Sequence, residues 1–272
     1  MSREYKILKQ AYESIKKKIP YVPEIAITLG SGLSDFVNDI KKDEVIDYAK
    51  IKNFPKATNA NHKGKFVFAT INGKRVLFMQ GRIHFYEGYT SIDAVRPVRL
   101  VAMMGIKKLI LTNAAGATNK NYKVGDIMII KDHISLFAPN PLIGENVEEL
   151  GTRFPDMTNV YDKELIQVIK KVANKNKIKM QEGVYCQVKG PSYESAAEIK
   201  LISKIGADAV GMSTVIETIA ARHAGMKVAG MSIITNMGTG LSKVKLSDDD
   251  VRETAQKISK KFEKLIKGII NS

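Results

Sequence analysis

Short apolar runs alternate with stretches of helical periodicity along most of this chain. Residues 24–29, 108–112 and 227–234 each predict a buried strand, because each is a short run rich in apolar residues. Apolar residues recur at three- and four-residue spacing over 5–19 and 251–269, which predicts amphipathic helices. Strands that alternate with helices are typical of an α/β fold with a largely parallel sheet. Further helices are predicted at 163–173, 195–204 and 215–223, and further strands at 124–135, 180–189 and 207–211.

A tight hairpin interrupts this parallel pattern. Residues 66–70 and 75–79 each predict a strand, and the Asn72-Gly73 pair between them is a strong signal for a two-residue turn. The sheet is therefore expected to be mixed. We find no internal repeat, low-complexity tract or change of composition that would mark a linker. The sequence predicts a single domain over residues 1–272, with a mixed, mostly parallel central sheet flanked by helices.

Local signals mark the ends of other elements. Thr90 and Asp93 form a capping-box pattern that opens a helix through Met104, and Pro97 would kink that helix or shift its start. Residues 137–159 show no clear period, and a long irregular loop in a compact domain is often functional.

Composition narrows the classes of partner. The formal net charge of +15 favours phosphates, nucleotides, nucleic acid or anionic membranes. The lysines are scattered and no aromatic residues interleave with them, so a nucleic-acid-binding protein is the weaker alternative. Cys186 is the only cysteine, which excludes an intrachain disulfide and a cysteine-rich zinc site, and we expect it to be a buried small apolar residue. The N-terminal segment lacks an apolar signal block and no stretch approaches the length of a membrane span. We expect a cytoplasmic protein with no nucleic-acid or membrane partner.

Several buried strands end in small or polar residues. They are the segments 30–32, 113–116, 212–213 and 235–236. Ligands of open α/β sheets bind beyond the carboxyl ends of strands. We therefore predict that these four segments converge on one pocket.

Arg82, His84 and Ser31 are suited to binding an oxyanion. Arg82 and His84 are two residues apart, so in an extended segment their side chains point the same way. Arginine can grip phosphate through two parallel hydrogen bonds, and His84 can donate another or hold a proton that phosphate loses. Ser31 lies between glycines whose exposed N–H groups favour an anion. Taken alone, the same residues also fit a strand-to-helix turn, a surface arginine and a capping histidine.

Glu194 and Asn236 are suited to the edge of a purine. A carboxylate only accepts hydrogen bonds, which suits the N1–H and N2–H donors of guanine, whereas the amide of Asn236 could donate to N7. Each residue alone also fits a helix-end acid or a turn asparagine. No His-x-x-x-His or His-Glu-x-x-His pair is present, so no metal site is predicted, and His133 and His223 are expected to be structural.

Six segments occur in an order that resembles the trimeric branch of the purine nucleoside phosphorylase family. The resemblance runs from Ile27 to about Val251, and the six together are highly specific although each could arise by chance. The segments that carry it are residues 28–33, 81–89, 112–116, 190–195, 211–215 and 234–236.

This resemblance implies a barrel-like mixed sheet flanked by helices. It also implies phosphorolysis of 6-oxopurine (deoxy)ribonucleosides, such as inosine and guanosine, to the free base and (deoxy)ribose 1-phosphate in purine salvage. The family needs no organic cofactor or metal, since inorganic phosphate is a co-substrate, and it implies a homotrimer.

The resemblance also assigns residue roles. The catalytic residues would be Asn236, Glu194 and His84. Phosphate would be held by Ser31, Arg82, His84, His62, Ser213 and the backbone N–H of Ala114. The nucleoside would contact Tyr86 and Met212 at the ribose, and Tyr193, Glu194 and Asn236 at the base.

Two positions depart from the family pattern. Relatives often place a histidine at the start of the last helix, where this chain has Asp248, which is therefore a candidate ribose contact and also an ordinary capping acid. Relatives send a phenylalanine over the ribose of the neighbouring subunit, and Leu150 stands at that place. The related 5′-methylthioadenosine phosphorylases are the alternative function. Adenine presents an acceptor at N1 that would repel Glu194, so hypoxanthine and guanine are favoured.

Overall fold

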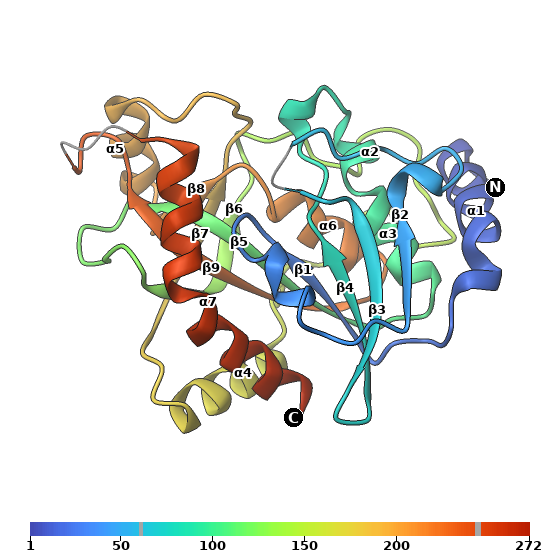
Figure 1. Ribbon diagram of the computed structural model, residues 1–272. Helices are drawn as coiled ribbons and strands as arrows, with labels where there is room; N and C mark the ends of the chain where they lie inside the picture. Colours follow the sequence, from blue (N-terminus) through green and yellow to red (C-terminus); the bar gives the residue numbers. More distant parts are fainter. Residues whose placement is uncertain (60–61, 243–245) are drawn as a thin grey trace.

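Nine strands form one mixed sheet in the part of the chain that the computed structural model describes, residues 1–59, 62–242 and 246–272. Their order is β2-β3-β4-β1-β5-β8-β7-β6-β9, and β9 also pairs with β5. The last five strands in this order therefore close into a barrel, and β1 to β4 extend from it as an open sheet (Figure 1). The strands are β1 (Ile25–Leu29), β2 (Glu44–Asp47), β3 (Lys65–Ile71), β4 (Lys74–Gln80), β5 (Lys108–Ala117), β6 (Ile127–Ile134), β7 (Met180–Gln187), β8 (Ala209–Gly211) and β9 (Lys227–Met237).

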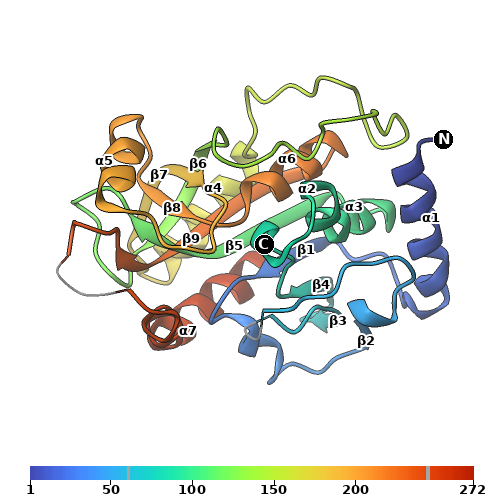
Figure 2. The ribbon, with the colours of Figure 1, turned by 90° about the horizontal axis from the view of Figure 1, so that it is seen from above.

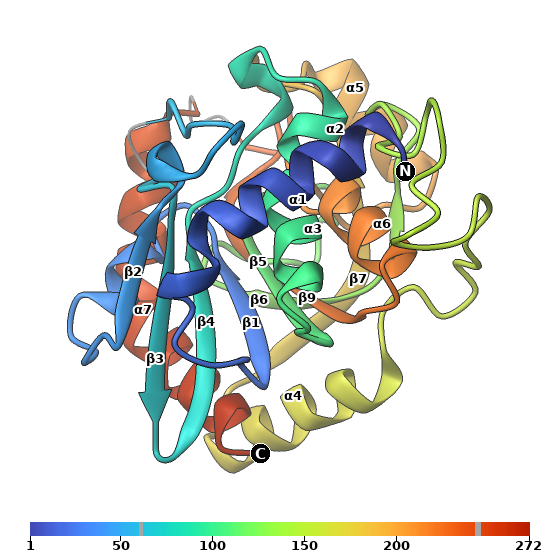
Figure 3. The ribbon, with the colours of Figure 1, turned by 90° about the vertical axis from the view of Figure 1, so that its right-hand side faces the viewer.

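Helices cover both faces of this sheet. They are α1 (Arg3–Ile15), α2 (Ser91–Ala94), α3 (Arg96–Met103), α4 (Lys163–Lys175), α5 (Ala196–Lys204), α6 (Val215–His223) and α7 (Asp248–Ile270). One apolar cluster joins α1, α3 and α6 to the face seen in Figure 3, and a second joins α4 and α7 to the opposite face. Figure 2 shows α5 beyond β7 and β8, where a smaller cluster forms.

The strands that pass between these layers are buried on both faces. Ile25, Ile27 and Leu29 of β1 pack into the cluster with α4 and α7, whereas Ala26 packs into the cluster with α1, α3 and α6. Successive side chains of a strand point to opposite faces, so a strand between two helical layers is predominantly apolar on both. This confirms the prediction of an α/β fold with a mixed, barrel-like sheet flanked by helices.

The local signals in the sequence produce the elements that they predict. Asn72 and Gly73 have φ of 50° and 80°, so both occupy the left-handed region that a tight hairpin turn between β3 and β4 requires. Thr90 and Asp93 form the expected capping box. The predicted helix is divided at Val95 into α2 and α3, with Pro97 in the first turn of α3.

β5 and β9 run further than the sequence predicts. The segments 113–116 and 235–236 lie inside these strands and do not follow them. The two strands pair in parallel as far as Ala117 and Met237, with a bulge between Ala115 and Gly116. The small residues here allow close packing within the ladder and do not terminate it, which corrects the predicted strand ends.

The remaining predictions about segments concern a loop, a cysteine and membrane spans. Residues 135–162 contain no helix or strand, in agreement with the irregular loop predicted at 137–159. Cys186 is fully buried in β7. Among the described helices, none is long and apolar enough to cross a membrane.

Candidate active site

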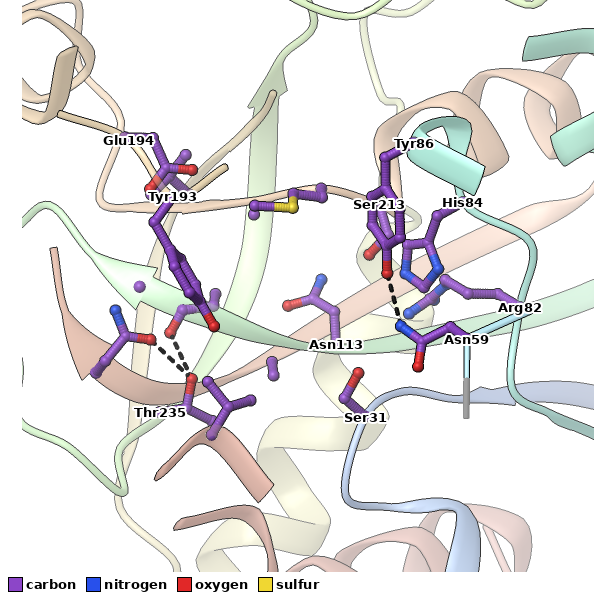
Figure 4. A pocket seen from close by; sticks show the side chains of 18 residues that line it. Ser31, Asn59, Arg82, His84, Tyr86, Asn113, Tyr193, Glu194, Ser213 and Thr235 are labelled. Carbon is purple, nitrogen blue, oxygen red and sulfur yellow. Dashed lines mark hydrogen bonds between the residues drawn. The ribbon is translucent and has the colours of Figure 1, made fainter. Parts of the chain in front are cut away.

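A polar pocket lies where β1, β5, β8 and β9 present their small and polar residues (Figure 4). All four segments that the sequence predicts to converge contribute to its wall. The lining residues are Ser31, Asn59, Arg82, His84, Tyr86, Asn113, Ala114, Ala115, Gly116, Tyr193, Glu194, Val210, Gly211, Met212, Ser213, Thr235, Asn236 and Val251. The structure therefore brings together ten of the twelve candidate residues, all except His62 and Asp248.

Glycine at position 30 allows β1 and β5 to approach closely beside the pocket. A Cβ atom on Gly30 would lie 2.6 Å from the carbonyl oxygen of Thr112. The backbone N–H of Gly30 instead donates to the Thr112 hydroxyl at 3.2 Å. Gly32 follows with φ of 73°, and a Cβ there would lie 2.3 Å from Cβ of Ala255 in α7. These two glycines hold the turn that carries Ser31 in the pocket wall.

Arg82 is buried with only part of its hydrogen-bonding capacity used. Its Nε donates to Oε2 of Glu217 at 2.9 Å, and its Nη1 donates to the carbonyl of Thr112 at 2.8 Å. Its Nη2 is buried and has no hydrogen-bond partner among the described residues. A buried guanidinium nitrogen without a partner is costly, so an anion in this pocket would satisfy it. The sequence indicates Arg82 but not Glu217, which lies 135 positions further along the chain.

His84 is oriented by an adjacent acid. Oε1 of Glu87 lies 3.3 Å from Nδ1 of His84 and accepts from the His84 backbone N–H at 2.7 Å. Burial pushes the pKa of Glu87 upward, but hydrogen bonds from His84 and Thr58 outweigh it and lower that pKa to about 2. Burial also lowers the pKa of His84, which favours the neutral imidazole. Because an ionised carboxylate only accepts, Nδ1 carries the proton and Nε2 is left as a hydrogen-bond acceptor.

His62 lies behind the pocket wall. Its Nε2 is 3.5 Å from the hydroxyl of Ser31, and its ring centroid is 4.8 Å from that of His84. Burial, followed by the nearby His84 and Arg82, holds the pKa of His62 well below its usual range. Gly81 has φ of 91°, and a Cβ there would lie 2.6 Å from Cβ of His62. The structure thus places His62 against the phosphate candidates as a neutral partner of Ser31.

The N-terminus of α6 supplies another polar part of the wall. The hydroxyls of Ser213 and Thr214 are 3.1 Å apart, and Nδ2 of Asn113 donates to the Thr214 hydroxyl at 2.8 Å. Thr214 has φ of 82°, which is unusual for a β-branched residue and needs strong local support. Glu217 provides part of that support, because its Oε2 accepts from the Thr214 N–H at 2.9 Å. Helix N-termini of this kind favour anions.

Glu194 and Tyr193 lie at the other end of the pocket from Arg82 and His84, as does Thr235, which contacts the lining residue Asn236 (Figure 4). The Thr235 hydroxyl donates to Oδ1 of Asn236 at 3.0 Å, which assigns the opposite side of that amide as the donor Nδ2. Burial raises the pKa of Glu194, and this makes its carboxylate a stronger hydrogen-bond acceptor. One wall therefore offers an acceptor and a donor on separate side chains.

Sequence reasoning missed two groups of residues in and around the pocket. Asn59 lines it and donates through Nδ2 to the Tyr86 hydroxyl at 2.8 Å. Glu87 accepts from the Thr58 hydroxyl at 2.6 Å as well as from His84, so it ties residues 58–59 to the segment that carries Tyr86. No sequence pattern links these positions. The Thr214–Glu217 spacing, by contrast, is a capping-box pattern that could have indicated Glu217.

The other candidate residues lie away from the pocket or outside the described side chains. Asp248 opens α7, but its side chain is not among those that the structure describes. Leu150 lines a separate surface hollow beside α1 and α3. His133 lies 3.1 Å from the Tyr161 hydroxyl, and His223 lies 3.2 Å from Oδ1 of Asn146. Neither histidine lines the pocket, in agreement with a structural role.

Known proteins resemble this chain over nearly its whole length. A sequence profile described as the phosphorylase superfamily matches residues 24–271. Purine nucleoside phosphorylase 1 of Geobacillus stearothermophilus is 45% identical over 97% of this chain and 97% of its own length. Purine nucleoside phosphorylase of Bos taurus is 41% identical over 92% of this chain and 89% of its own. The crystal structure of Schistosoma mansoni purine nucleoside phosphorylase in complex with inosine has a TM-score of 0.92 and 37% identity, covering 98% of this chain and 96% of that one.

The barrel, the polar pocket and these similarities define the class: the chain belongs to the phosphorylase superfamily. Within that superfamily it is a member of the purine nucleoside phosphorylases, as its identity to the bacterial and mammalian enzymes shows.

Proposed function

We propose that this pocket carries out phosphorolysis of 6-oxopurine nucleosides, giving the free base and a pentose 1-phosphate. The observation that carries the proposal is the division of one pocket into two chemical ends. Arg82, with its buried Nη2, lies near Ser213 and His84 and suits an oxyanion. Glu194 and Asn236 at the other end suit a purine edge.

The mechanism follows from this division. The glycosidic bond breaks, its electrons pass to the purine, and positive charge develops on the sugar between the two ends. Phosphate held by Arg82 and the N-terminus of α6 stabilises that charge and then forms a bond to C1′. Nδ2 of Asn236, set by the Thr235 hydroxyl, donates to N7 as the base gains charge. Neutral His84 offers Nε2 to a phosphate proton.

The preference for a 6-oxopurine rests on Glu194 and Asn236. A carboxylate repels the N1 acceptor of adenine and accepts from N1–H of hypoxanthine or guanine. The solved Schistosoma relative is described in complexes with adenosine and with inosine, so base preference is the property to measure. The 5′-methylthioadenosine phosphorylase alternative is not favoured.

The test is release of free base from inosine and adenosine, with and without inorganic phosphate. We expect phosphate-dependent release from inosine and little from adenosine. The variant Asn236→Asp should move the ratio of kcat/KM values toward adenosine. A protonated aspartic acid can donate to N7 with one oxygen and accept from the 6-amino group of adenine with the other. Release without phosphate would mean hydrolysis, and an unchanged ratio in the variant would remove Asn236 from base recognition.

We further propose that the enzyme works as a homotrimer without organic cofactor or metal. Leu150 does not line the pocket of its own chain, and this supports its contact with the ribose site of a neighbouring subunit. No cluster of three or more His, Cys, Asp or Glu residues that could hold a metal is found among the described residues. Light scattering that reports a monomer with full activity would contradict the shared site.

A further inference from the structure

Glu217 is a buried acid that the reaction as proposed does not use. It lies in the first turn of α6, and 3% of the residue is exposed. A single oxygen, Oε2, accepts from Nε of Arg82 at 2.9 Å and from the backbone N–H of Thr214 at 2.9 Å. One donor belongs to Arg82 of the pocket wall and the other to Thr214, which follows the wall residue Ser213, so this oxygen joins two separate segments of the site.

The first contact fixes the plane of the Arg82 guanidinium. Glu217 holds Nε and the carbonyl of Thr112 holds Nη1. Because the guanidinium is planar and rigid, fixing two of its nitrogens determines the direction of the third. That third nitrogen, Nη2, is the buried atom without a partner among the described residues, and Arg82 lines the pocket.

The second contact holds the backbone that precedes α6. Thr214 keeps φ of 82° while its N–H is bound by Glu217, and its neighbour Ser213 lines the pocket. A strained conformation persists only where its surroundings specify it. Loss of the Oε2 contact would therefore release Thr214 and, with it, the position of the Ser213 hydroxyl.

We propose that Glu217 is a positioning residue for the phosphate co-substrate, acting through one carboxylate oxygen that sets both Arg82 and Ser213. The inference rests on the proposed phosphate site. Its role is geometric and not electrostatic, because a negative charge near a phosphate dianion opposes binding. The acid neutralises Arg82, so any gain in phosphate affinity comes from the direction of Nη2 and the conformation at Thr214.

Two substitutions separate geometry from charge. Glu217→Gln keeps an acceptor oxygen at the same reach and removes the charge. Glu217→Asp keeps the charge and withdraws the oxygen by one methylene. A geometric role predicts that KM for phosphate rises about tenfold or more in Glu217→Asp. In Glu217→Gln, KM for phosphate should stay within about threefold of the unsubstituted enzyme. KM for inosine should change by less than about threefold in both, because Glu194 and Asn236 are untouched.

A matched control removes a comparable ion pair elsewhere. Arg96 donates from Nε to Oε1 of Glu4 at 2.9 Å, away from the pocket. Glu4→Ala should therefore lower Tm without changing KM for phosphate. A second readout is the rise in Tm on adding inorganic phosphate alone, which we expect to be lost in Glu217→Asp and kept in Glu217→Gln and Glu4→Ala.

The outcomes distinguish this inference from the function on which it rests. If the unsubstituted enzyme releases base without phosphate, the proposed function fails. If it depends on phosphate but Glu217→Asp keeps its phosphate KM and its phosphate-induced Tm rise, the positioning role fails alone. It also fails if KM for phosphate and KM for inosine rise together, because a residue that only supports the fold would affect both. It fails as well if Glu217→Gln raises KM for phosphate while Glu217→Asp does not.

Discussion

Burial changes the hydrogen-bonding strength of Glu194, one of the two side chains proposed to bind the purine base. Glu194 is half-buried, and desolvation raises its pKa, so its carboxylate is a stronger acceptor for a purine N–H than an exposed acid. Removing it would leave a donor of the bound base without a partner. The same burial that makes the contact strong therefore makes its loss costly.

We expect Glu194→Ala to lower kcat/KM for inosine by about 30- to 150-fold, which corresponds to about 2–3 kcal/mol for one charged hydrogen-bond partner. Steady-state kinetics with inosine at saturating phosphate measures this. Glu182→Ala, which removes an acid from a surface ion pair with Lys170, is the control and should leave kcat/KM unchanged. Turnover close to that of the unsubstituted enzyme would exclude Glu194 from the site.

At the scale of residues, the sequence predicts the groups that would touch a ligand better than the groups that hold them. Arg82 and His84 are recognised from the sequence because arginine and histidine are residue types that bind oxyanions. Glu217 reaches Arg82, and Asn59 reaches Tyr86, across long stretches of chain, and such contacts depend on tertiary structure. Glu87 is close in sequence to His84, yet its second role, binding residues 58–59, is also invisible to local pattern.

Among the helices and strands, the ends of β5 and β9 depend on tertiary pairing that the local sequence does not encode. Runs of small residues such as 113–116 resemble turns, because glycine and asparagine usually end strands. Here they continue β5, since its partner β9 continues alongside and the barrel requires close approach at the pocket. Helix boundaries agree more closely with the sequence, because side-chain caps define them: the Thr90 hydroxyl accepts from a backbone N–H in the cap that its sequence indicates, and Ser195 caps the next predicted helix in the same way.

Gly116→Ala tests whether this close approach positions the Asn236 amide, which we propose binds the base. A Cβ at position 116 would lie 2.9 Å from Nδ2 of Asn236, so the amide must shift. A shift of this kind is expected to lower kcat for inosine by about 10- to 100-fold. Gly144→Ala meets no atom within 4 Å, and it is the control for a glycine substitution outside the pocket, although its φ of 109° adds strain. Retention of full kcat in Gly116→Ala would show that Asn236 tolerates displacement.

The closed barrel is the feature of the whole fold that local sequence pattern does not predict. Alternating strands and helices predict an α/β protein, and the hairpin predicts a mixed sheet. Closure depends on β9 pairing with both β5 and β6, which are more than 90 positions earlier in the chain. Only the family resemblance indicated a barrel, because no local signal encodes such a distant pairing.

The four histidines of the chain make the whole fold sensitive to acid. Burial lowers the pKa of His62, His84 and His223, and it lowers the pKa of His133 to about 4. In the unfolded chain histidine has an ordinary pKa of 6.5. Below that pH the histidines bind protons in the unfolded state but stay neutral in the folded state. The free energy of unfolding therefore falls as the pH falls.

We therefore expect Tm to decline from pH 7 to pH 5, and most steeply below pH 6.5, where the slope contributed by each histidine that stays neutral approaches about 1.4 kcal/mol per pH unit. Differential scanning calorimetry across that range measures the slope. Glu87 acts in the same direction but only as the pH falls below the ordinary glutamate value of 4.5 toward about 2, so it does not contribute here. His133→Gln, which removes one buried group outside the pocket, should make the slope shallower. A Tm that stays constant between pH 7 and pH 5 would mean that the buried histidines accept protons in the folded protein.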